Sequence, residues 1–548
     1  MVAVQTARFQ RRWLRGDMLG ALTAWALIVP ECVAYAQIAG VPPQNAFYGA
    51  PVALVVYAVL GRSRFLIIGA TSAAAVLSGA TVSDVSSDAK AAVGLSAALA
   101  VITGAVLIVA GLARLGFVTR FLAEPVLTGF LFGMALTIVV RQAAKIVGVS
   151  SGDGQFFERA WTVLRAIPDW SVASLTVGAL ALAALFALER YVPRLPASLL
   201  VLAAALAVSA AAGLKDHGVA VVGKIPAAVP VPHLPGIPAA DWWKLAGGAC
   251  GVALVVFAEA YSIAGRFARE HGDEVNANRE MAAVGAANIA VGLVRGFTVS
   301  GSASRSAAAE AAGARSQLTS LVAAALILVT GAFLTPLFTD LPEPVLGAIV
   351  IMAVRSFLRT AELRRYAHLD RASLWVALTA LAGVLLFDLL PGLLIAVTLS
   401  LLLFIAAAGT LNLAVLGRLP GSPLYGDTSQ HPGTATVPGV LLLRPDGTLF
   451  FGNTDRTRLA ILAQTAATQP TPRAVVLDLS ATYRLGLPVL DTLDELRAAL
   501  ERRGVALHLA RLRSSARPAF DAHPLAVHLE PGAVHNDVQD AVTALGPP

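Results

Sequence analysis

The sequence predicts an all-α polytopic membrane protein with a small α/β domain at its carboxyl end. Three observations lead to this fold class. The 548 residues are 57% hydrophobic and 14% charged, whereas soluble domains carry about 25% charged residues. Apolar segments of the length needed to cross a bilayer, about 20 residues, follow one another over residues 17–410. After Arg418 the chain becomes rich in Gly, Pro and Ser, and strand-like segments then alternate with helix-like ones.

Fourteen apolar segments are candidate membrane spans. Their approximate ranges are 17–38, 46–60, 65–80, 91–111, 120–141, 171–189, 195–213, 245–264, 276–294, 298–312, 317–338, 342–356, 372–389 and 391–410. Lys and Arg favour alternate loops, beginning with Arg11, Arg12 and Arg15 before the first segment. Because cytoplasmic loops carry the excess of Lys and Arg, we expect a multi-pass protein of the inner membrane with both termini in the cytoplasm.

The third and tenth segments are not ordinary apolar helices. The tenth contains residues 296–306 (GFTVSGSASRS), which are small and polar and include Arg305. The third opens at residues 61–72 with an extended β-branched run and continues as a small-residue helix. Each interruption occupies the third position of its half of the chain, so the sequence predicts a 7+7 inverted repeat. We expect the two short helices to meet N-terminus to N-terminus in mid-membrane.

These helix starts are candidates for an anion site, because free N–H groups and the helix dipole both favour negative charge. The hydroxyls of Ser300, Ser302 and Ser304 can replace the water around an anion, and Arg305 adds positive potential. Small residues in this pattern are also common in helix packing. We favour the binding site, since an arginine inside the membrane is expensive and usually functional.

Two acidic residues also lie inside apolar segments, Glu31 in the first and Glu259 in the eighth. A carboxylate close to a bound anion repels it unless the carboxylate is protonated. We therefore expect Glu31 and Glu259 to couple proton uptake to anion binding, the alternative being a structural ion pair, for example with Arg305. Tyr35, one turn after Glu31, is expected to face the site, or else to serve in helix packing.

Other classes of protein fit the sequence poorly. Two cysteines, Cys32 and Cys250, give neither a disulfide framework nor a metal-ligand spacing. The nine histidines are scattered, and neither a nucleophile–base pair nor a phosphate-binding loop is evident. We expect no enzyme activity, no cofactor and no metal. The net charge of +7 follows from basic loops between spans and does not indicate nucleic-acid binding.

The carboxyl-terminal part of the chain reads as a separate domain. Residues 418–436 resemble a linker, because Gly, Pro, Ser and Thr dominate them. Residues 440–444, 474–479 and 506–510 are strand-like, and residues 491–503 form an amphipathic helix pattern. This alternation predicts a small α/β domain over residues 437–548 that lies outside the lipid.

Several motifs, taken in order, strongly resemble those of the sulfate permease (SulP) family, also called solute carrier family 26. The motifs are residues 30–43 (PECVAYAQIAGVPP), residues 60–64 (LGRSR) with Gly69, residues 278–280 (NRE), Gly285, Asn288, and residues 296–297 and 300–306 (GF and SGSASRS). The first two look like the family's first span and its entry to the third span. The rest look like its ninth and tenth spans.

The resemblance implies an architecture and a set of site residues. Residues 1–417 would form a transport domain in which spans 1–4 and 8–11 are a moving core and spans 5–7 and 12–14 a gate. A cytoplasmic STAS domain and a homodimer are also implied. The implied anion contacts are Glu31, Tyr35, Ala70, Thr71, Ala303, Ser304 and Arg305, to which we add Ser300, Gly301 and Ser302 from the same segment. Glu259 matches an acid of the eighth span that is linked to proton or cation coupling in this fold.

One departure from the family pattern bears on function. Glu31 stands where many members have Gln, which argues against simple chloride conduction and for a site that takes up protons. We therefore expect a proton-coupled secondary transporter of small anions, with an elevator-like motion, most similar in character to bacterial dicarboxylate (fumarate) symporters. The alternatives are a bicarbonate or sulfate transporter, an anion exchanger or channel, a nucleobase permease of the same fold, and a membrane-tethered signalling module.

Overall fold

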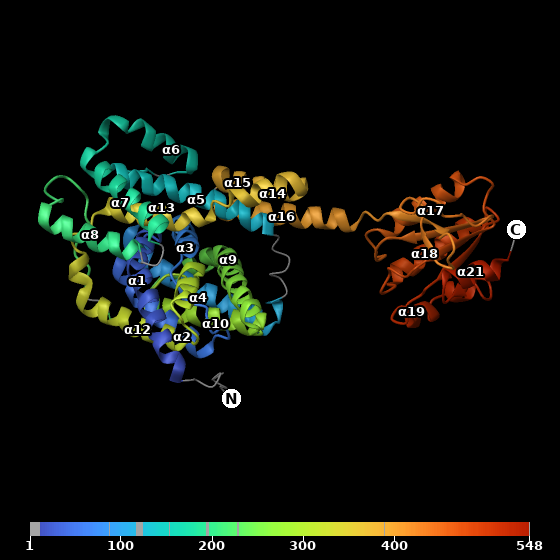
Figure 1. Cartoon of the computed structure of the whole chain (residues 1–548), viewed down its shortest axis with the longest axis horizontal. Coiled ribbons are helices and arrows are strands. Elements are labelled where there is room, and N and C mark those ends of the chain that lie inside the picture. The colour runs from blue at the N-terminus through green and yellow to red at the C-terminus, as the bar shows by residue number, and fades with distance from the viewer. Residues whose placement is uncertain are drawn as a thin grey trace. The chain divides into compact units, whose positions relative to one another are not determined.

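The computed structural model describes residues 11–86, 88–116, 124–152, 154–192, 197–226, 229–387 and 389–546. The chain forms two compact units, Met1–Ser400 and Leu401–Pro548, and many of their helices are labelled in Figure 1. The first unit is helical, and the second is an α/β unit. The predicted fold class therefore agrees with the structure at this level.

Sixteen α-helices are described up to residue 408. They are α1 (Leu14–Ile38), α2 (Pro43–Leu60), α3 (Ser72–Val85), α4 (Ala89–Leu112), α5 (Glu124–Val147), α6 (Phe156–Arg165), α7 (Val172–Tyr191), α8 (Ala197–Ala212), α9 (Ala239–His271), α10 (Ala277–Gly292), α11 (Ala303–Ala311), α12 (Leu318–Val329), α13 (Glu343–Val354), α14 (Thr360–Leu369), α15 (Arg371–Phe387) and α16 (Leu389–Ala408). Two short strands, β1 (Ile68–Gly69) and β2 (Ser300–Gly301), precede α3 and α11.

Each of the fourteen expected segments overlaps one of these helices, whereas α6 and α14 were not expected. Residues 120–123, 195–196 and 388 of the expected segments lie outside the described residues. Six helices in the described part of the chain are long and apolar enough to cross a membrane, and four more apolar helices are shorter. The structure thus supports a polytopic membrane protein, while the count of fourteen spans stays a prediction.

Small residues let several of these helices pack closely. A Cβ atom on Gly104 of α4 would lie 2.4 Å from the carbonyl oxygen of Gly285 on α10. A Cβ atom on Gly129 of α5 would lie 1.9 Å from the carbonyl oxygen of Ala377 on α15. Such contacts between glycine and backbone are typical of membrane helices. They produce one tightly packed group that contains α4 and α10 and another that contains α5 and α15.

A buried acid that the sequence analysis did not single out ties the two halves of the helical unit together. Asp17 of α1 is fully buried. Its Oδ1 accepts hydrogen bonds from the backbone N–H groups of Arg315, at 2.7 Å, and Ser316, at 3.0 Å, and its Oδ2 accepts one from the Ser316 hydroxyl, at 2.6 Å. Asp17 therefore satisfies backbone donors just before α12.

The second unit is built on a six-stranded sheet with the order β4-β3-β5-β6-β7-β8. Its strands are β3 (Leu413–Arg418), β4 (Tyr425–Asp427), β5 (Val440–Pro445), β6 (Ala474–Asp478), β7 (Ala506–Ala510) and β8 (Val534–His535). Strands β5 to β8 are parallel, and β3 runs antiparallel to both β4 and β5. The stretch 418–436 contains β4, and the expected domain boundary there stays a prediction.

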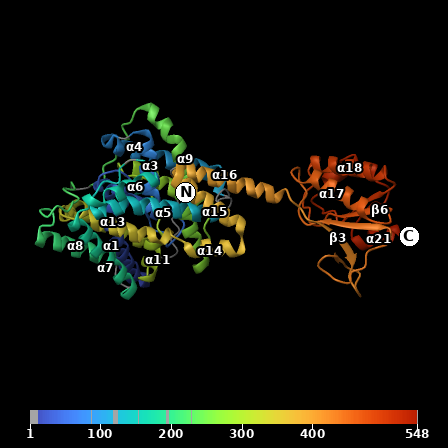
Figure 2. The ribbon, with the colours of Figure 1, turned by 90° about the horizontal axis from the view of Figure 1, so that it is seen from above.

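Helices cover both faces of this sheet (Figure 2). They are α17 (Thr454–Ala467), α18 (Leu487–Glu501), α19 (Arg517–Asp521), α20 (Leu525–His528) and α21 (Val538–Leu545). Leu441 and Leu443 pack with the apolar residues of α17 and α18, whereas Leu442 packs with those of α21. This alternation follows from the strand geometry, in which successive side chains point to opposite faces.

Candidate functional site

The two interrupted segments meet in space. Strands β1 and β2 pair antiparallel, with Ile68 opposite Gly301 and Gly69 opposite Ser300. The pairing is extended by a hydrogen bond of 3.0 Å from the Ser302 N–H to the Ile67 carbonyl. Two chain segments more than 200 residues apart in sequence thus place the first turns of α3 and α11 next to each other, as the inverted repeat predicts.

Hydroxyl side chains cap both short helices. Thr71 is the N-cap of α3, and its Oγ1 accepts a hydrogen bond from the Ala74 N–H at 3.2 Å. Ser302 is the N-cap of α11, and its Oγ accepts one from the Arg305 N–H at 3.4 Å. The positive ends of two helix dipoles therefore point toward one region.

Asn288 of α10 holds the extended stretch before α11 in place. Its Oδ1 accepts a hydrogen bond from the Val299 N–H, and its Nδ2 donates one to the Val299 carbonyl, both at 2.9 Å. The amide thus pairs with the backbone as a neighbouring strand would. Asn288 is fully buried, so this contact satisfies backbone groups that water cannot reach.

Arg305 lies at the junction and is 1% exposed. Its Nε is 3.3 Å from Oε2 of Glu31 on α1, and its Nη2 donates a hydrogen bond to the carbonyl of Ala70. A Cβ atom on Gly69 would lie 2.6 Å from Nη1. The absence of a side chain at Gly69 is therefore what lets the guanidinium rest against the β1 backbone.

Glu259 of α9 approaches the same junction from another side. Its Oε2 accepts a hydrogen bond of 3.2 Å from the hydroxyl of Thr71, the cap of α3. In the part of the chain that the structure describes, no basic side chain lies within ion-pair distance of Glu259. This carboxyl group therefore has no direct ion-pair partner of the kind that Glu31 has in Arg305.

A cavity of about 500 Å³ opens beside these groups, and we call it the central cavity. The expected site residues that line it are Glu31, Tyr35, Thr71, Glu259, Ser302, Ala303, Ser304 and Arg305. Ala303 and Ser304, in the first turn of α11, are exposed into it. A helix start that presents backbone N–H groups to a polar cavity is suited to binding an anion.

Three expected site residues do not line the central cavity. The Ser300 hydroxyl is fully buried and donates to the Val256 carbonyl of α9 at 2.9 Å. Gly301 packs against Ala260, since a Cβ there would lie 2.9 Å from the Ala260 Cα. Ala70 takes part through its carbonyl, which accepts the hydrogen bond from Arg305. In this conformation these three residues contact the residues around the cavity but do not themselves line it.

The cavity also has a second wall that the sequence analysis missed. Glu189 of α7, Ser198 of α8, Met352 of α13 and Arg355 line it together with Ser72 at the start of α3. Arg355 lies 3.6 Å from Glu189. These residues sit near the ends of ordinary apolar helices, where a charged side chain is typical of the membrane boundary, so no sequence signal distinguished them.

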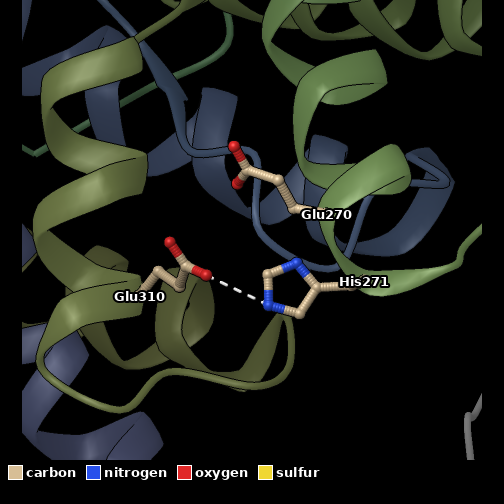
Figure 3. A group of neighbouring side chains, drawn as sticks. All are labelled: Glu270, His271 and Glu310. Atoms are coloured by element: carbon tan, nitrogen blue, oxygen red, sulfur yellow. Dashed lines mark ion pairs between the residues drawn. The ribbon is translucent and has the colours of Figure 1, made fainter.

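A group of titratable side chains lies outside the central cavity, where α9 ends near α11 (Figure 3). The potential ligand atoms of Glu270, His271 and Glu310 lie within 4.8 Å of one another, and His271 Nε2 is 3.0 Å from Glu310 Oε1. Scattered histidines had suggested no such group. Arg266 pairs with Glu270 at 3.0 Å, and Arg315 lies 3.4 Å from His271 Nε2. Because Arg266 already compensates Glu270 and His271 already pairs with Glu310, we interpret the group as a structural contact that joins α9 and α11.

Comparisons with known proteins match the chain to two domain families. The sulfate permease family model matches residues 14–380, and the STAS domain model matches residues 431–541. A "Probable sulfate transporter MT1781" of Mycobacterium tuberculosis is 36% identical over 95% of this chain and 93% of its own length. Human "Solute carrier family 26 member 6" is 31% identical over 81% of this chain and 62% of its own.

Solved structures share the fold. A structure of SLC26A9 superposes with a TM-score of 0.90 at 21% identity and covers 98% of this chain and 92% of that one. The transmembrane domain of a cyanobacterial bicarbonate transporter, BicA, superposes with a TM-score of 0.63 at 21% identity over 71% of this chain and 98% of that one. With its two matching domain models and its relatives above 30% identity, this chain belongs to the sulfate permease family, or solute carrier family 26, of membrane anion transporters that carry a STAS domain.

Proposed function

We propose that the protein is a secondary transporter that carries one small anion together with a proton. The observation that carries this proposal is the position of Glu259. It lines the same cavity as the starts of α3 and α11, and it accepts a hydrogen bond from the cap of α3. An anion held by these helix starts therefore lies close to a carboxyl group that has no ion-pair partner among the described residues.

The charges of the central cavity make protonation a condition for binding. The carboxylates of Glu31, Glu189 and Glu259 contribute −3, and Arg305 and Arg355 contribute +2, so the net charge is −1 when all are ionised. Two like charges 4 Å apart repel by about 4 kcal/mol at an effective dielectric constant of 20. Protonating Glu259 removes this repulsion, so a proton on Glu259 and an anion in the cavity favour each other.

Glu31 gives a second point of coupling. Its carboxylate lies 3.3 Å from Arg305 Nε, so an ionised Glu31 competes with an incoming anion for the guanidinium. Protonating Glu31 releases the positive charge of Arg305 toward the cavity. Arg305 stays at the edge of the site, because its Nη2 remains bound to the Ala70 carbonyl. From there it contributes a positive electrostatic potential to the cavity.

The two walls of the cavity suggest how the anion moves. One wall comes from α1, α3, α9 and α11, and the other from α7, α8 and α13. We propose that the first group belongs to a core of spans 1–4 and 8–11, which slides past a gate of spans 5–7 and 12–14 in an elevator-like motion. The proposal includes residues 1–417 as the transport domain, residues 437–548 as the STAS domain, both termini in the cytoplasm of an inner-membrane protein, and a homodimer.

The substrate we favour is a divalent oxyanion. Dicarboxylates such as fumarate suit the protonatable site at Glu31 and Glu259. Sulfate is the second candidate, and the names of relatives, "Probable sulfate transporter" among them, support it equally well. A neutral nucleobase is disfavoured because it would leave the positive ends of α3 and α11 without a counter-charge.

A substrate screen in proteoliposomes tests the proposal. Uptake of radiolabelled fumarate, sulfate, bicarbonate and uracil is measured with and without an inward proton gradient, for the wild type and for Glu31→Gln. We expect one of the oxyanions to accumulate only with the gradient, and Glu31→Gln to weaken this dependence. An anion flux that does not depend on the proton gradient would support an exchanger or channel instead. Uracil uptake that anions do not inhibit would support a nucleobase permease.

A further inference from the structure

A second cavity lies between the same two groups of helices, and we call it the basic cavity. It has a volume of about 500 Å³. Its lining comes from α1, α3, α5, α6 and the first residue of α13. Its polar side chains include Gln37, Arg141, Lys145, Arg159 and Glu343.

The two cavities follow one another along shared helices. On α1 the central cavity is lined by Glu31 and the basic cavity by Gln37, which is an axial separation of about 9 Å at 1.5 Å per residue. On α13 the basic cavity is lined by Glu343 at the first residue, and the central cavity by Met352 near the last turn. The basic cavity therefore lies beyond the site, toward the opposite ends of these helices from Arg355.

The lining of the basic cavity has an excess of positive charge. Arg141, Lys145 and Arg159 contribute +3 and Glu343 contributes −1, so the excess is +2. The central cavity has a net charge of −1 by the same count. Arg159, on α6, is half-buried, and its Nε donates to the Gly154 carbonyl. A guanidinium has five N–H donors, so this bond orients the group and leaves further donors for a ligand.

Lys145 joins the two groups of helices at this cavity. Its Nζ donates a hydrogen bond of 2.7 Å to Oε1 of Gln37 on α1 and lies 4.0 Å from Glu343 on α13. Gln37 thus belongs to the proposed core, and Lys145 and Glu343 to the proposed gate. An anion that draws Lys145 away from Gln37 weakens a contact that must break when the core slides past the gate.

We propose that the basic cavity is a second anion site, where a small oxyanion binds to Arg141, Lys145 and Arg159 before it enters the central cavity. This inference rests on the proposed transport function. On the proposed topology the basic cavity faces the outside of the cell, so it concentrates anions at the entrance of a transport site that is itself acidic.

Sulfate uptake by the full chain in proteoliposomes tests this second site. The variant is Arg159→Gln, and the matched control is Arg165→Gln on the same helix, because Arg165 is exposed, stacks on Trp161 and does not line the cavity. We expect Arg159→Gln to raise the KM for external sulfate about fivefold, the effect of one unit charge near an anion, and to leave the maximal rate within about twofold. Lys145→Gln should raise the same KM, and Arg165→Gln should not.

Two outcomes would overturn the inference. An unchanged KM in both Arg159→Gln and Lys145→Gln would show that the basic cavity does not bind the anion. An equal rise in Arg165→Gln would show a general surface potential rather than a site. Fumarate is measured in parallel, and failure of the wild type to take up either anion would contradict the proposed function itself, which separates that failure from failure of the second site.

Discussion

The guanidinium of Arg305 lies 3.3 Å from the carboxylate of Glu31, with the two side chains 1% and 13% exposed. Arg305 comes from the first turn of α11 and Glu31 from the middle of α1, so the pair joins the two halves of the helical unit. Removing one partner of a buried ion pair leaves the other charge uncompensated and typically costs about 3–5 kcal/mol.

The first prediction follows from this pair. Arg305→Gln should lower the free energy of unfolding by about 3 kcal/mol and abolish anion uptake. The double variant Glu31→Gln/Arg305→Gln should regain most of the stability, because the Glu31 carboxylate that the single variant leaves unpaired is gone. It should not regain uptake, because the positive electrostatic potential of Arg305 is still missing. Thermal unfolding in detergent and proteoliposome uptake measure the two effects. Equal stability of the single and double variants would show that the pair is not coupled.

The second prediction concerns Glu259. Since Glu259→Gln mimics the protonated side chain in shape and charge, it should still bind the anion but respond less to a proton gradient, with Glu31 as the remaining point of coupling. We expect uptake by this variant to change less between pH 5.5 and pH 7.5 than wild-type uptake, which falls as pH rises. Glu270→Gln is the control, because Glu270 lies on the same helix and outside the central cavity. A Glu259→Gln variant with the wild-type pH profile would remove Glu259 from the coupling mechanism.

The third prediction uses the close contact between Gly69 and Arg305. In Gly69→Ala the new Cβ would lie 2.6 Å from Arg305 Nη1, so the guanidinium must shift. We expect anion uptake to fall about tenfold or more, since positioning errors near 1 Å can cost about a hundredfold in comparable sites. Gly247→Ala on α9 is the matched control, because nothing lies within 4 Å of the added atom. Equal anion uptake by the two variants would show that the contact between Gly69 and Arg305 does not affect transport.

The fourth prediction concerns the α/β unit, where His508 of β7 lies 3.0 Å from His535 of β8. Burial lowers the pKa of both imidazoles, and for His508 repulsion by His535 lowers its pKa further. The unfolded chain takes up protons near the ordinary pKa of about 6.5, whereas the folded unit does so only at lower pH. Because the unfolded state then binds more protons, the stability of the unit should fall as pH drops below about 6.5 and stay level above it.

Hydrogen exchange of the full chain measures this effect. We expect the amides of β7 to lose protection between pH 7 and pH 5.5, after correction for intrinsic rates, and His508→Leu to reduce that loss. His431→Gln, at an exposed position, should behave like the wild type. Protection of β7 that does not change with pH in the wild type would contradict the prediction.

Much of this fold could be predicted from the sequence because the third and tenth apolar segments are interrupted by short stretches whose composition differs clearly from that of a membrane helix. A glycine- and serine-rich stretch around Ser302 cannot continue a lipid-facing helix, so the break before α11 was visible, and the extended β-branched run within residues 61–72 showed the break before α3. The amphipathic helices α6 and α14 were missed because their mixed polarity resembles that of a loop. The six-stranded sheet extends further toward the amino terminus than expected, since β3 begins at Leu413.

The candidate site was predictable only where polar residues stand out from an apolar background. Glu31, Glu259 and Arg305 stand out in this way, and all three line the central cavity. The direction of a hydroxyl does not follow from sequence, and Ser300 turns out to donate to the Val256 carbonyl. Glu189 and Arg355 could not be assigned either, because only the packing of α7 beside α13 brings them to the cavity.

If an anion and a proton occupy the central cavity together, as we propose, anion uptake must acidify the vesicle lumen. Internal pH is recorded with a trapped dye while wild-type proteoliposomes take up fumarate or sulfate without an imposed gradient. Addition of the transported anion should acidify the lumen in proportion to uptake, and Glu259→Gln liposomes should acidify less for the same uptake. Anion uptake by the wild type with no change in internal pH would contradict the proposal.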